Sequence, residues 1–549
     1  MYELCINELL WGVEFSPDKH PVWWQNATRD AYPYGLSITG LRWTPYMHEA
    51  AEIMSLPPSR GMSFKVSPNC AGHWYCGAPL APWETAAERE LKFREYLRPW
   101  LQNPREQWHK YREELKADFE PIKAFDFEKA RDHEISIFLD DVVWPFTRKA
   151  HRVHHLCMYP LSACYMMFEE MAREVLGLDP NSPVFRKLFQ GFQTENYIVD
   201  EKLWWLAQQA QELGLKKALS KSTTQEVLAE LERSNRGRKW KEEFTHFVQE
   251  YGWRNDTFDD TSLPGWVDDP TLPLLHIRDM MGKKGELPIV EKRAALAKER
   301  EALTEELMRK CPADQKDRFL SLLQLAQLNQ VFSEEHTLFI EQPVNVIMWR
   351  FAATMGKRFQ RAGALDHWKD VFYLSYEEIK YRIIEYPICD FRKLVERRKK
   401  LWKEAKEKEK ETYYLGNPET IEVEPILRRV CGYGESIKQV EGAIVTGFPS
   451  SPGIAQGPAR VITSHDELHT VEEGELLVAH LTWSTWTPIF PLIRGVVTEF
   501  GGTLSHTAVV AREYGIPAVV SAREATKKIK TGQIIEINGS TGVVRILRG

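Results

Sequence analysis

A single histidine near the carboxyl end of the chain lies where a glycine-rich loop is predicted to meet a helix. Gly501 and Gly502 free the backbone for a tight turn, and the hydroxyl of Thr503 or Ser505 can cap the helix that follows. The positive end of that helix stabilises a bound anion and disfavours a protonated imidazole. His506 is therefore predicted to be a neutral, nucleophilic imidazole at an anion site, which is what a transient phosphohistidine requires.

The residues on either side of His506 resemble the swivelling phosphohistidine domain of the phosphoenolpyruvate-utilising enzymes. The resemblance covers residues 443–549 and includes the motifs Ser451-Pro452-Gly453, Gly495-Val496-Val497-Thr498-Glu499 and Ala511-Arg512-Glu513-Tyr514-Gly515. It implies that His506 carries the phosphoryl group and that Thr482, Gly501, Gly502 and Ser505 lie beside the phosphate. Residues 482–488 depart from the family's usual pattern and read Thr-Trp-Ser-Thr-Trp-Thr-Pro.

The hydrophobic pattern changes along the 549-residue chain and predicts a multidomain protein. Amphipathic segments with apolar residues at i, i+3 and i+4 recur between residues 84 and 411 and predict long helices. After residue 442, short β-branched runs predict strands around few helices. We therefore expect a large, mainly helical acceptor-substrate domain at residues 1–416, a linker at 417–442 and a small α/β swivelling phosphohistidine domain at 443–549.

Composition limits the partners and the compartment. The formal net charge is −6 and no strongly basic domain stands out, so we expect no nucleic-acid partner. No apolar run approaches the ~20 residues that span a bilayer, and the first residues lack the order of a signal peptide, so we expect no membrane segment. The eight cysteines form no C-x-x-C pair and are expected to be reduced thiols in the cytoplasm.

The helical part carries a second resemblance, to the substrate domain of rifampicin phosphotransferase-type enzymes, at residues 247–254, 264–270 and 364–374. Trp253 stands where the common pattern has a histidine, so either another residue supplies its chemistry or the pocket is more aromatic here. Arg254 could hold a phosphate. The layout resembles the large subunit of phenylphosphate synthase, which implies phosphorylation of a small aromatic hydroxyl, such as phenol or cresol, with ATP converted to AMP and phosphate.

A phosphocarrier also needs a donor site. The sequence contains neither a G-x-x-x-x-G-K-[ST] loop nor a Rossmann fingerprint. It also lacks the arginine-rich ATP-binding domain and the phosphoenolpyruvate-binding barrel that accompany the histidine domain in single-chain relatives, and it ends at Gly549. We therefore expect a separate subunit to bind ATP and Mg²⁺, which makes the protein part of a hetero-oligomer.

Four histidines of the helical part are candidates for the base that deprotonates the acceptor: His151, His154, His155 and His336. His151 and His155 are four residues apart and share a helix face. Glu334 and Glu335 precede His336 and could orient it. No matching carboxylate pattern follows the three clustered histidines, so we predict no metal site.

Two other functions fit the same residues. The phosphohistidine mechanism could act on a different acceptor, such as a ketone enol, an antibiotic hydroxyl or pyruvate; pyruvate is the weakest of these without the barrel. Alternatively, the chain could be a non-catalytic phosphocarrier or regulatory protein whose helical part binds a partner instead of a substrate.

Overall fold

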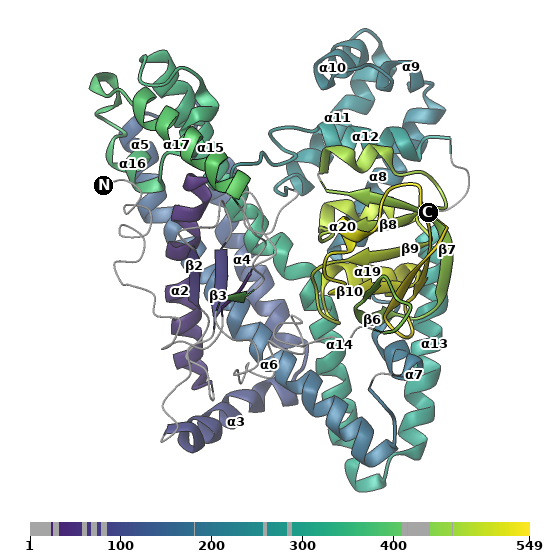
Figure 1. Cartoon of the computed structure of the whole chain (residues 1–549). Helices are drawn as coiled ribbons and strands as arrows, with labels where there is room; N and C mark the ends of the chain where they lie inside the picture. The colour runs from purple at the N-terminus through teal and green to yellow at the C-terminus, as the bar shows by residue number, and fades with distance from the viewer. Residues whose placement is uncertain are drawn as a thin grey trace. The chain divides into compact units, whose positions relative to one another are not determined.

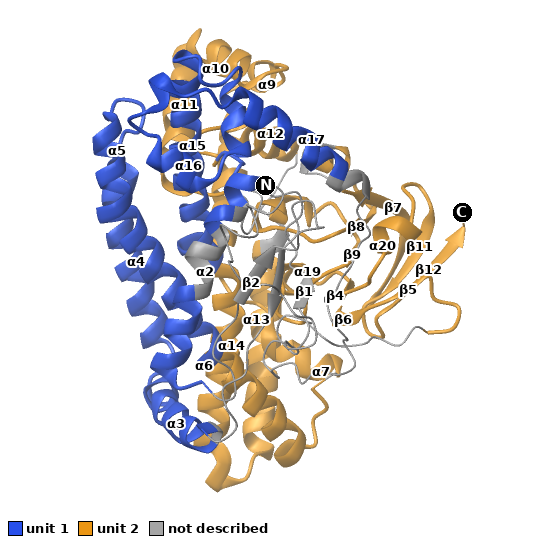
Figure 2. Cartoon of the chain, turned by 60° about the vertical axis from the view of Figure 1, so that its left-hand side comes forward, with its two compact units in different colours: residues 1–160, 257–264, 336–425 blue, residues 161–256, 265–335, 426–549 orange. Residues whose placement is uncertain are grey.

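The computed structural model describes residues 23–25, 32–56, 63–66, 74–77, 85–180, 182–255, 261–282, 288–408, 414–415, 440–463 and 465–548. The chain divides into two compact units, coloured separately in Figure 2. Unit 1 holds residues 1–160, 257–264 and 336–425, and unit 2 holds residues 161–256, 265–335 and 426–549. Residues 161–256 and 265–335 therefore share a unit with the carboxyl-terminal sheet. Most of the predicted 417–442 linker lies outside the described residues, so the domain boundary stays a prediction.

Unit 1 is built from helices and a small antiparallel sheet. Its sheet has the strand order β2-β3-β1-β4, with β1 at Trp23–Gln25, β2 at Ser63–Val66, β3 at Trp74–Gly77 and β4 at Tyr414–Leu415. Its helices are α2 (Pro33–Met54), α3 (Ala86–Gln102), α4 (Glu106–Ala124), α5 (Asp132–Phe138), α15 (Glu341–Arg361), α16 (Tyr376–Tyr381) and α17 (Arg392–Lys408), with the first half of α6 (Trp144–Leu176). The hydroxyl of Tyr34, in α2, donates a hydrogen bond to the Met348 carbonyl of α15 at 2.8 Å.

The helical part of unit 2 surrounds an apolar core. Its helices are the second half of α6, α7 (Pro183–Arg186), α8 (Glu195–Glu212), α9 (Lys216–Leu219), α10 (Thr224–Glu232), α11 (Asn235–Tyr251), α12 (Thr271–Met280), α13 (Pro288–Lys310) and most of α14 (Lys316–Phe339). Local sequence signals fix several helix starts. The Thr223 hydroxyl accepts from the Glu226 backbone N–H before α10, and the Ser234 hydroxyl accepts from that of Gly237 before α11.

The carboxyl-terminal part of unit 2 is a sheet with helices, drawn in green to yellow in Figure 1. The strand order is β5-β12-β11-β7-β8-β9-β10-β6, and the central strands β7 to β10 run parallel. The strands are β5 (Val445–Thr446), β6 (Phe448–Ser451), β7 (Ile454–Ile462), β8 (Leu476–Ala479), β9 (Gly495–Thr498), β10 (Ala518–Val520), β11 (Ile534–Asn538) and β12 (Val543–Arg548). Strands β8 to β10 are buried along their length, as parallel strands covered on both faces must be.

This arrangement confirms the predicted fold class, a large and mainly helical part followed by a small α/β domain. Two helices complete the small domain: α19 (His506–Tyr514) and α20 (Ala525–Lys528). No helix in the described ranges has the length and apolar character needed to cross a membrane.

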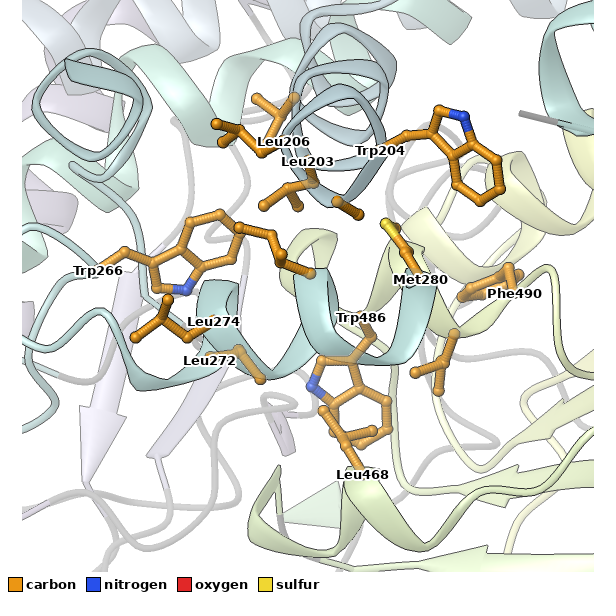
Figure 3. Close-up of a cluster of buried hydrophobic side chains, with 14 of the residues drawn as sticks. Leu203, Trp204, Leu206, Trp266, Leu272, Leu274, Met280, Leu468, Trp486 and Phe490 are labelled. Carbon is orange, nitrogen blue, oxygen red and sulfur yellow. The ribbon is translucent and has the colours of Figure 1, made fainter. Parts of the chain in front are cut away.

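Apolar side chains pack the small domain onto the helices of unit 2. Trp486 and Phe490 of the small domain belong to the same buried cluster as Trp204 of α8 and Met280 of α12 (Figure 3). Trp486 is 4% exposed and Phe490 1%. Because the hydrophobic effect scales with the apolar area removed from water, this cluster is the main physical reason for the docked position of the small domain.

Candidate phosphohistidine site

His506 is the first residue of α19, as the sequence predicted. Gly501 has φ +117°, a conformation that favours glycine, and Gly515 has φ +56° and ends the helix. Ser505 is the N-cap residue with extended backbone, but its hydroxyl makes no capping hydrogen bond. The predicted hydroxyl cap is therefore wrong in its contact, although the start and end of the helix are confirmed. The imidazole lies at the positive end of the helix.

One carboxylate holds the imidazole of His506 in a defined orientation. The Nδ1 atom of His506 lies 2.9 Å from Oε2 of Glu334, a residue of α14 that is 1% exposed. A carboxylate only accepts hydrogen bonds, so Nδ1 carries the proton and Nε2 keeps its lone pair. Nε2 is buried and has no hydrogen-bond partner among the described residues. The nucleophilic nitrogen of the neutral imidazole is thus Nε2, which is shielded from solvent.

Asn196 and Arg254 form a buried polar network with Glu334. The amide nitrogen of Asn196 donates to the Glu334 carbonyl at 3.1 Å and to its carboxylate at 3.3 Å. Arg254 in turn donates to the Asn196 side-chain oxygen at 3.0 Å and lies over the Trp266 ring. Burial raises the pKa of nearby Asp200 well above its usual value, although the positive charge of Arg254 opposes the shift. Arg254 therefore helps to hold Glu334 in position through its hydrogen bond to Asn196.

The other residues predicted beside the phosphate lie around the same loop. The hydroxyls of Thr482 and Thr507 are 2.9 Å apart, and both residues are buried. Thr507 directly follows His506, so Thr482 lies close to the start of α19. The Ser505 hydroxyl is buried without a partner in the part of the chain that is described. Gly501 and Gly502 form the turn that precedes it.

Arg512, which the sequence identifies only as part of a motif, connects the His506 loop to two other segments. Its guanidinium donates to the Ser450 carbonyl at 3.1 Å, to the Thr503 carbonyl at 2.9 Å and to Gln330 of α14 at 2.8 Å. Arg512 is 6% exposed, and burial lowers its pKa. Because it joins the loop to a helix far away in sequence, it fixes the docked position of the His506 loop.

Glu513 makes a second buried contact with the helical part of unit 2. Its carboxylate accepts from the backbone N–H of Gly191 at 2.8 Å and from that of Phe192 at 3.4 Å. Burial raises the pKa of Glu513 to about 7, while the two backbone N–H groups and Arg512 act in the opposite direction. This carboxyl group is therefore close to half-protonated at neutral pH.

A pocket lies beside the His506 loop and is lined by aromatic and cationic side chains. Its lining residues include Tyr165, Phe189, Phe448, Leu504 and Arg512. Thr503 also lines it, whereas His506 does not. Its volume is about 40 Å³, and the Arg512 guanidinium already donates to Ser450, Thr503 and Gln330, so in this docked position the pocket is too small for an aromatic ligand.

The candidate bases of the helical part fall into two groups. His151 and His155 are fully buried in α6, and each Nδ1 contacts the backbone carbonyl four residues earlier, at 2.8 and 3.0 Å. Burial lowers the pKa of His155 well below its usual value, and the neighbouring imidazole of His154 adds to this shift. Both imidazoles therefore form local helix contacts, and the ring of His155 also lies beside that of His154, with centroids 4.8 Å apart.

His154 and His336 are brought together by a carboxylate that sequence reasoning did not find. Nδ1 of His154 lies 2.6 Å from Oε1 of Glu341, and Nδ1 of His336 lies 3.1 Å from Oε2 of the same residue. Glu341 is fully buried at the first position of α15. Burial alone would raise its pKa, but the two imidazoles hold the pKa well below its usual range. The only signal in the sequence is the spacing of five residues between His336 and Glu341.

The structure also places two other residues or pairs that the sequence singled out. Glu334 and Glu335 were expected to orient His336, but Glu341 makes that contact, and Glu334 contacts His506 instead. Trp253 is buried directly after α11, next to Arg254.

Comparisons with known proteins match two regions of the chain. Residues 471–542 match the PEP-utilising enzyme mobile domain, and residues 154–329 match the rifampicin phosphotransferase fourth domain. The first of these regions contains His506, and the second contains Glu334's network partners Asn196 and Arg254.

Several curated proteins are similar to the chain over part of their length. The uncharacterized phosphotransferase YvkC of Bacillus subtilis is 26% identical over 404 residues, which is 73% of this chain and 48% of YvkC. Rifampicin phosphotransferase of Bacillus cereus is 29% identical over 58% of this chain and 36% of its own length. Phosphoenolpyruvate synthase of Aeropyrum pernix is 38% identical over 24% of this chain and 16% of its own. The chain thus spans half or less of the length of these relatives.

These findings confirm both resemblances that the sequence suggested. Residues 471–542 are similar to the mobile domain of the PEP-utilising enzymes, and residues 154–329 are similar to the fourth domain of rifampicin phosphotransferase.

Proposed function

We propose that this chain is the acceptor-binding component of an ATP-dependent phosphotransferase and that Nε2 of His506 carries the phosphoryl group. The observation that carries this proposal is the His506–Glu334 contact, which places the proton on Nδ1 and leaves the lone pair on a buried Nε2. The similarity to proteins named phosphotransferases supports the same reaction class.

The two transfer steps follow from this tautomer. In the first step Nε2 attacks phosphorus, a nitrogen–phosphorus bond forms, and a phosphorus–oxygen bond breaks with its electron pair leaving on oxygen. The phosphorylated ring keeps the Nδ1 proton and is cationic, so a carboxylate at Nδ1 stabilises it. In the second step an acceptor oxygen attacks phosphorus, and the electron pair of the broken bond returns to Nε2.

The acceptor that we propose is a small aromatic hydroxyl of the phenol or cresol type, which gives an aryl phosphate. Support comes from the layout of the chain, which resembles the phenylphosphate synthase large subunit. An antibiotic hydroxyl is the second candidate, because residues 154–329 match a domain of rifampicin phosphotransferase. The hydroxyl must lose a proton as it attacks, and His151, His154, His155 and His336 are the proposed candidates for that base.

ATP and Mg²⁺ belong to a separate subunit in this proposal. The carboxylate that contacts His506 is already engaged by the imidazole and by Asn196, which does not fit a magnesium–nucleotide site. Magnesium would neutralise the phosphate oxygens of ATP in the donor subunit. The small domain would then carry the phosphoryl group from that subunit to the docked position described above.

The test uses the full chain, an ATP-binding subunit and ATP labelled in its phosphates. We expect alkali-stable, acid-labile label on the wild-type chain and its transfer to phenol or cresol. His506→Ala should take up no label. His480→Ala is the matched control, because His480 also has its Nδ1 on a carboxylate, that of Glu499, at 2.8 Å. Full labelling of His506→Ala would refute the proposed carrier, and label that reaches rifampicin but no phenol would favour the second acceptor.

A further inference from the structure

A second group of reactive side chains lies in unit 1 and includes neither His506 nor its carboxylate partner Glu334. It consists of His154 of α6, His336 near the end of α14 and Glu341 at the start of α15. One ligand atom from each of the three residues lies within 4.8 Å of the others. The rings of His154 and His336 meet edge to face, with centroids 4.5 Å apart.

The donor types and their spacing match a metal centre. Two imidazoles and one carboxylate form the protein ligand set of several catalytic zinc sites and of non-haem iron sites. Two ligand atoms that each lie ~2.1 Å from one ion are about 3 Å apart at octahedral angles. At the tetrahedral angles of zinc the separation is about 3.4 Å. The nitrogen–oxygen separations on the two sides of the Glu341 carboxylate are 2.6 and 3.1 Å, so the three side chains would move apart by less than about 1 Å to admit the ion.

The charges of this group also favour a cation. Glu341 is 0% exposed, and the partners of its two carboxylate oxygens are both imidazoles, which carry no permanent charge. A buried carboxylate is costly unless a positive charge or a metal accompanies it. His154 is 5% exposed, so water does little to compensate. A divalent ion between the three side chains would supply a positive charge that does not depend on the protonation of the imidazoles.

We propose that His154, His336 and Glu341 bind one divalent transition-metal cation, and that Zn²⁺ is the ion that fits this ligand set best. Three protein ligands leave at least one coordination position for an oxygen ligand. A hydroxyl bound there would lose its proton more readily, because the cation stabilises the anion. Two of the four histidine candidates for the base would then be ligands, and this proposal departs from the expectation of no metal. The binding itself does not depend on phosphoryl transfer.

The experiment measures zinc binding by the full chain without an affinity tag, after dialysis against EDTA. Titration with Zn²⁺ against a chromophoric chelator should show one tight equivalent for the wild type. Glu341→Gln and His336→Gln should each weaken that equivalent by about 100-fold or more, since each removes a direct ligand. Co²⁺ in place of Zn²⁺ should give visible absorption bands in the wild type and lose them in both variants.

Glu499→Gln is the matched control, because it removes a buried carboxylate from another histidine, His480, outside this group. Its zinc affinity should equal that of the wild type. Far-UV circular dichroism establishes that each variant is folded, and the cobalt spectrum of the wild type tests the proposal even where a variant does not fold. A wild-type chain that binds no zinc, or that binds it no more tightly than folded Glu341→Gln, would overturn the inference. Neither result would bear on the labelling of His506, so the two proposals fail independently.

Discussion

Replacing Glu513 by glutamine is expected to stabilise the docked small domain at high pH, although it deletes a side chain that makes two hydrogen bonds. In the docked position burial raises the pKa of Glu513 to about 7, from an ordinary value of 4.5. The charged groups that face it, Arg512 and Arg300, both act to lower the pKa and do not prevent the rise. The docked state therefore prefers the uncharged carboxyl group, which a glutamine amide matches in charge and shape, although its NH2 group cannot accept from a backbone N–H as the second carboxyl oxygen does.

The sign and the size of the expected stability change follow from the linkage between proton binding and folding. A raised pKa means that the contribution to stability is complete below pH 4.5 and is lost as the pH rises through 7. The shift of about 2.5 pKa units, taken at ~1.36 kcal/mol per unit, corresponds to about 3 kcal/mol between these limits. About 0.8 kcal/mol of this is already lost at pH 5, so we expect the stability of Glu513→Gln relative to the wild type to rise by about 2.5 kcal/mol between pH 5 and pH 8.

The assay is urea unfolding followed by tryptophan fluorescence, run on both proteins at pH 5 and pH 8. Other buried groups also titrate, Asp200 among them, so the quantity of interest is the difference between the two proteins and not the pH profile of either. Deuterium exchange of the Gly191 and Phe192 amides, which donate to Glu513, reports the same contact locally. A variant that is less stable than the wild type at pH 8 would show that the ionised carboxylate is preferred, and the reasoning would be refuted.

Three more substitutions test the docked arrangement by chemical unfolding. Gly191→Ala should lower the free energy of unfolding by about 2–4 kcal/mol, because φ is +73° and a Cβ would overlap the Ala297 backbone. The control Gly177→Ala, with φ +61° in open space, should lower it by about 1 kcal/mol. Equal losses would contradict the close approach at Gly191. Arg512→Lys should lower the free energy of unfolding by about 2–3 kcal/mol and slow phosphoryl transfer, since one ammonium group cannot replace three separate contacts. A wild-type transfer rate in this variant would count against a role of Arg512 in positioning the loop. Trp486→Ala should cost about 3–5 kcal/mol and weaken docking, and an unchanged unfolding midpoint would exclude the apolar cluster as the main docking force.

The sequence predicted the His506 loop because its signals are local. A glycine pair, a hydroxyl residue and the stop at Gly515 all lie within about three turns of the histidine, and they decide the backbone there. The hydroxyl cap failed because Ser505 turns its side chain into a buried position, which depends on neighbours that local patterns do not report. The overall division into a helical part and an α/β part was predictable for the same reason, since hydrophobic periodicity is a short-range property.

The contacts that give the sites their chemistry could not be read from local patterns. His506 and Glu334 are 172 residues apart, and His154 and Glu341 are 187 residues apart. A glutamate in a helical pattern looks the same whether it faces water or an imidazole, and only packing distinguishes the two. Glu334 was therefore assigned to the nearest histidine in sequence, His336, although the fold pairs it with His506.

The apolar cluster around Trp486 and Phe490 also restricts any partner that receives the small domain. A domain that leaves the helices of unit 2 exposes an indole and a phenyl ring that are almost entirely covered in the docked position. Burial of a large side chain is worth about 1.5–3 kcal/mol, so two rings exposed to water would disfavour every departure by several kcal/mol. The ATP-binding subunit that we propose is therefore expected to have a nonpolar surface that covers the same two rings. Transfer of the small domain from the helices of unit 2 to that subunit would then be nearly neutral in free energy.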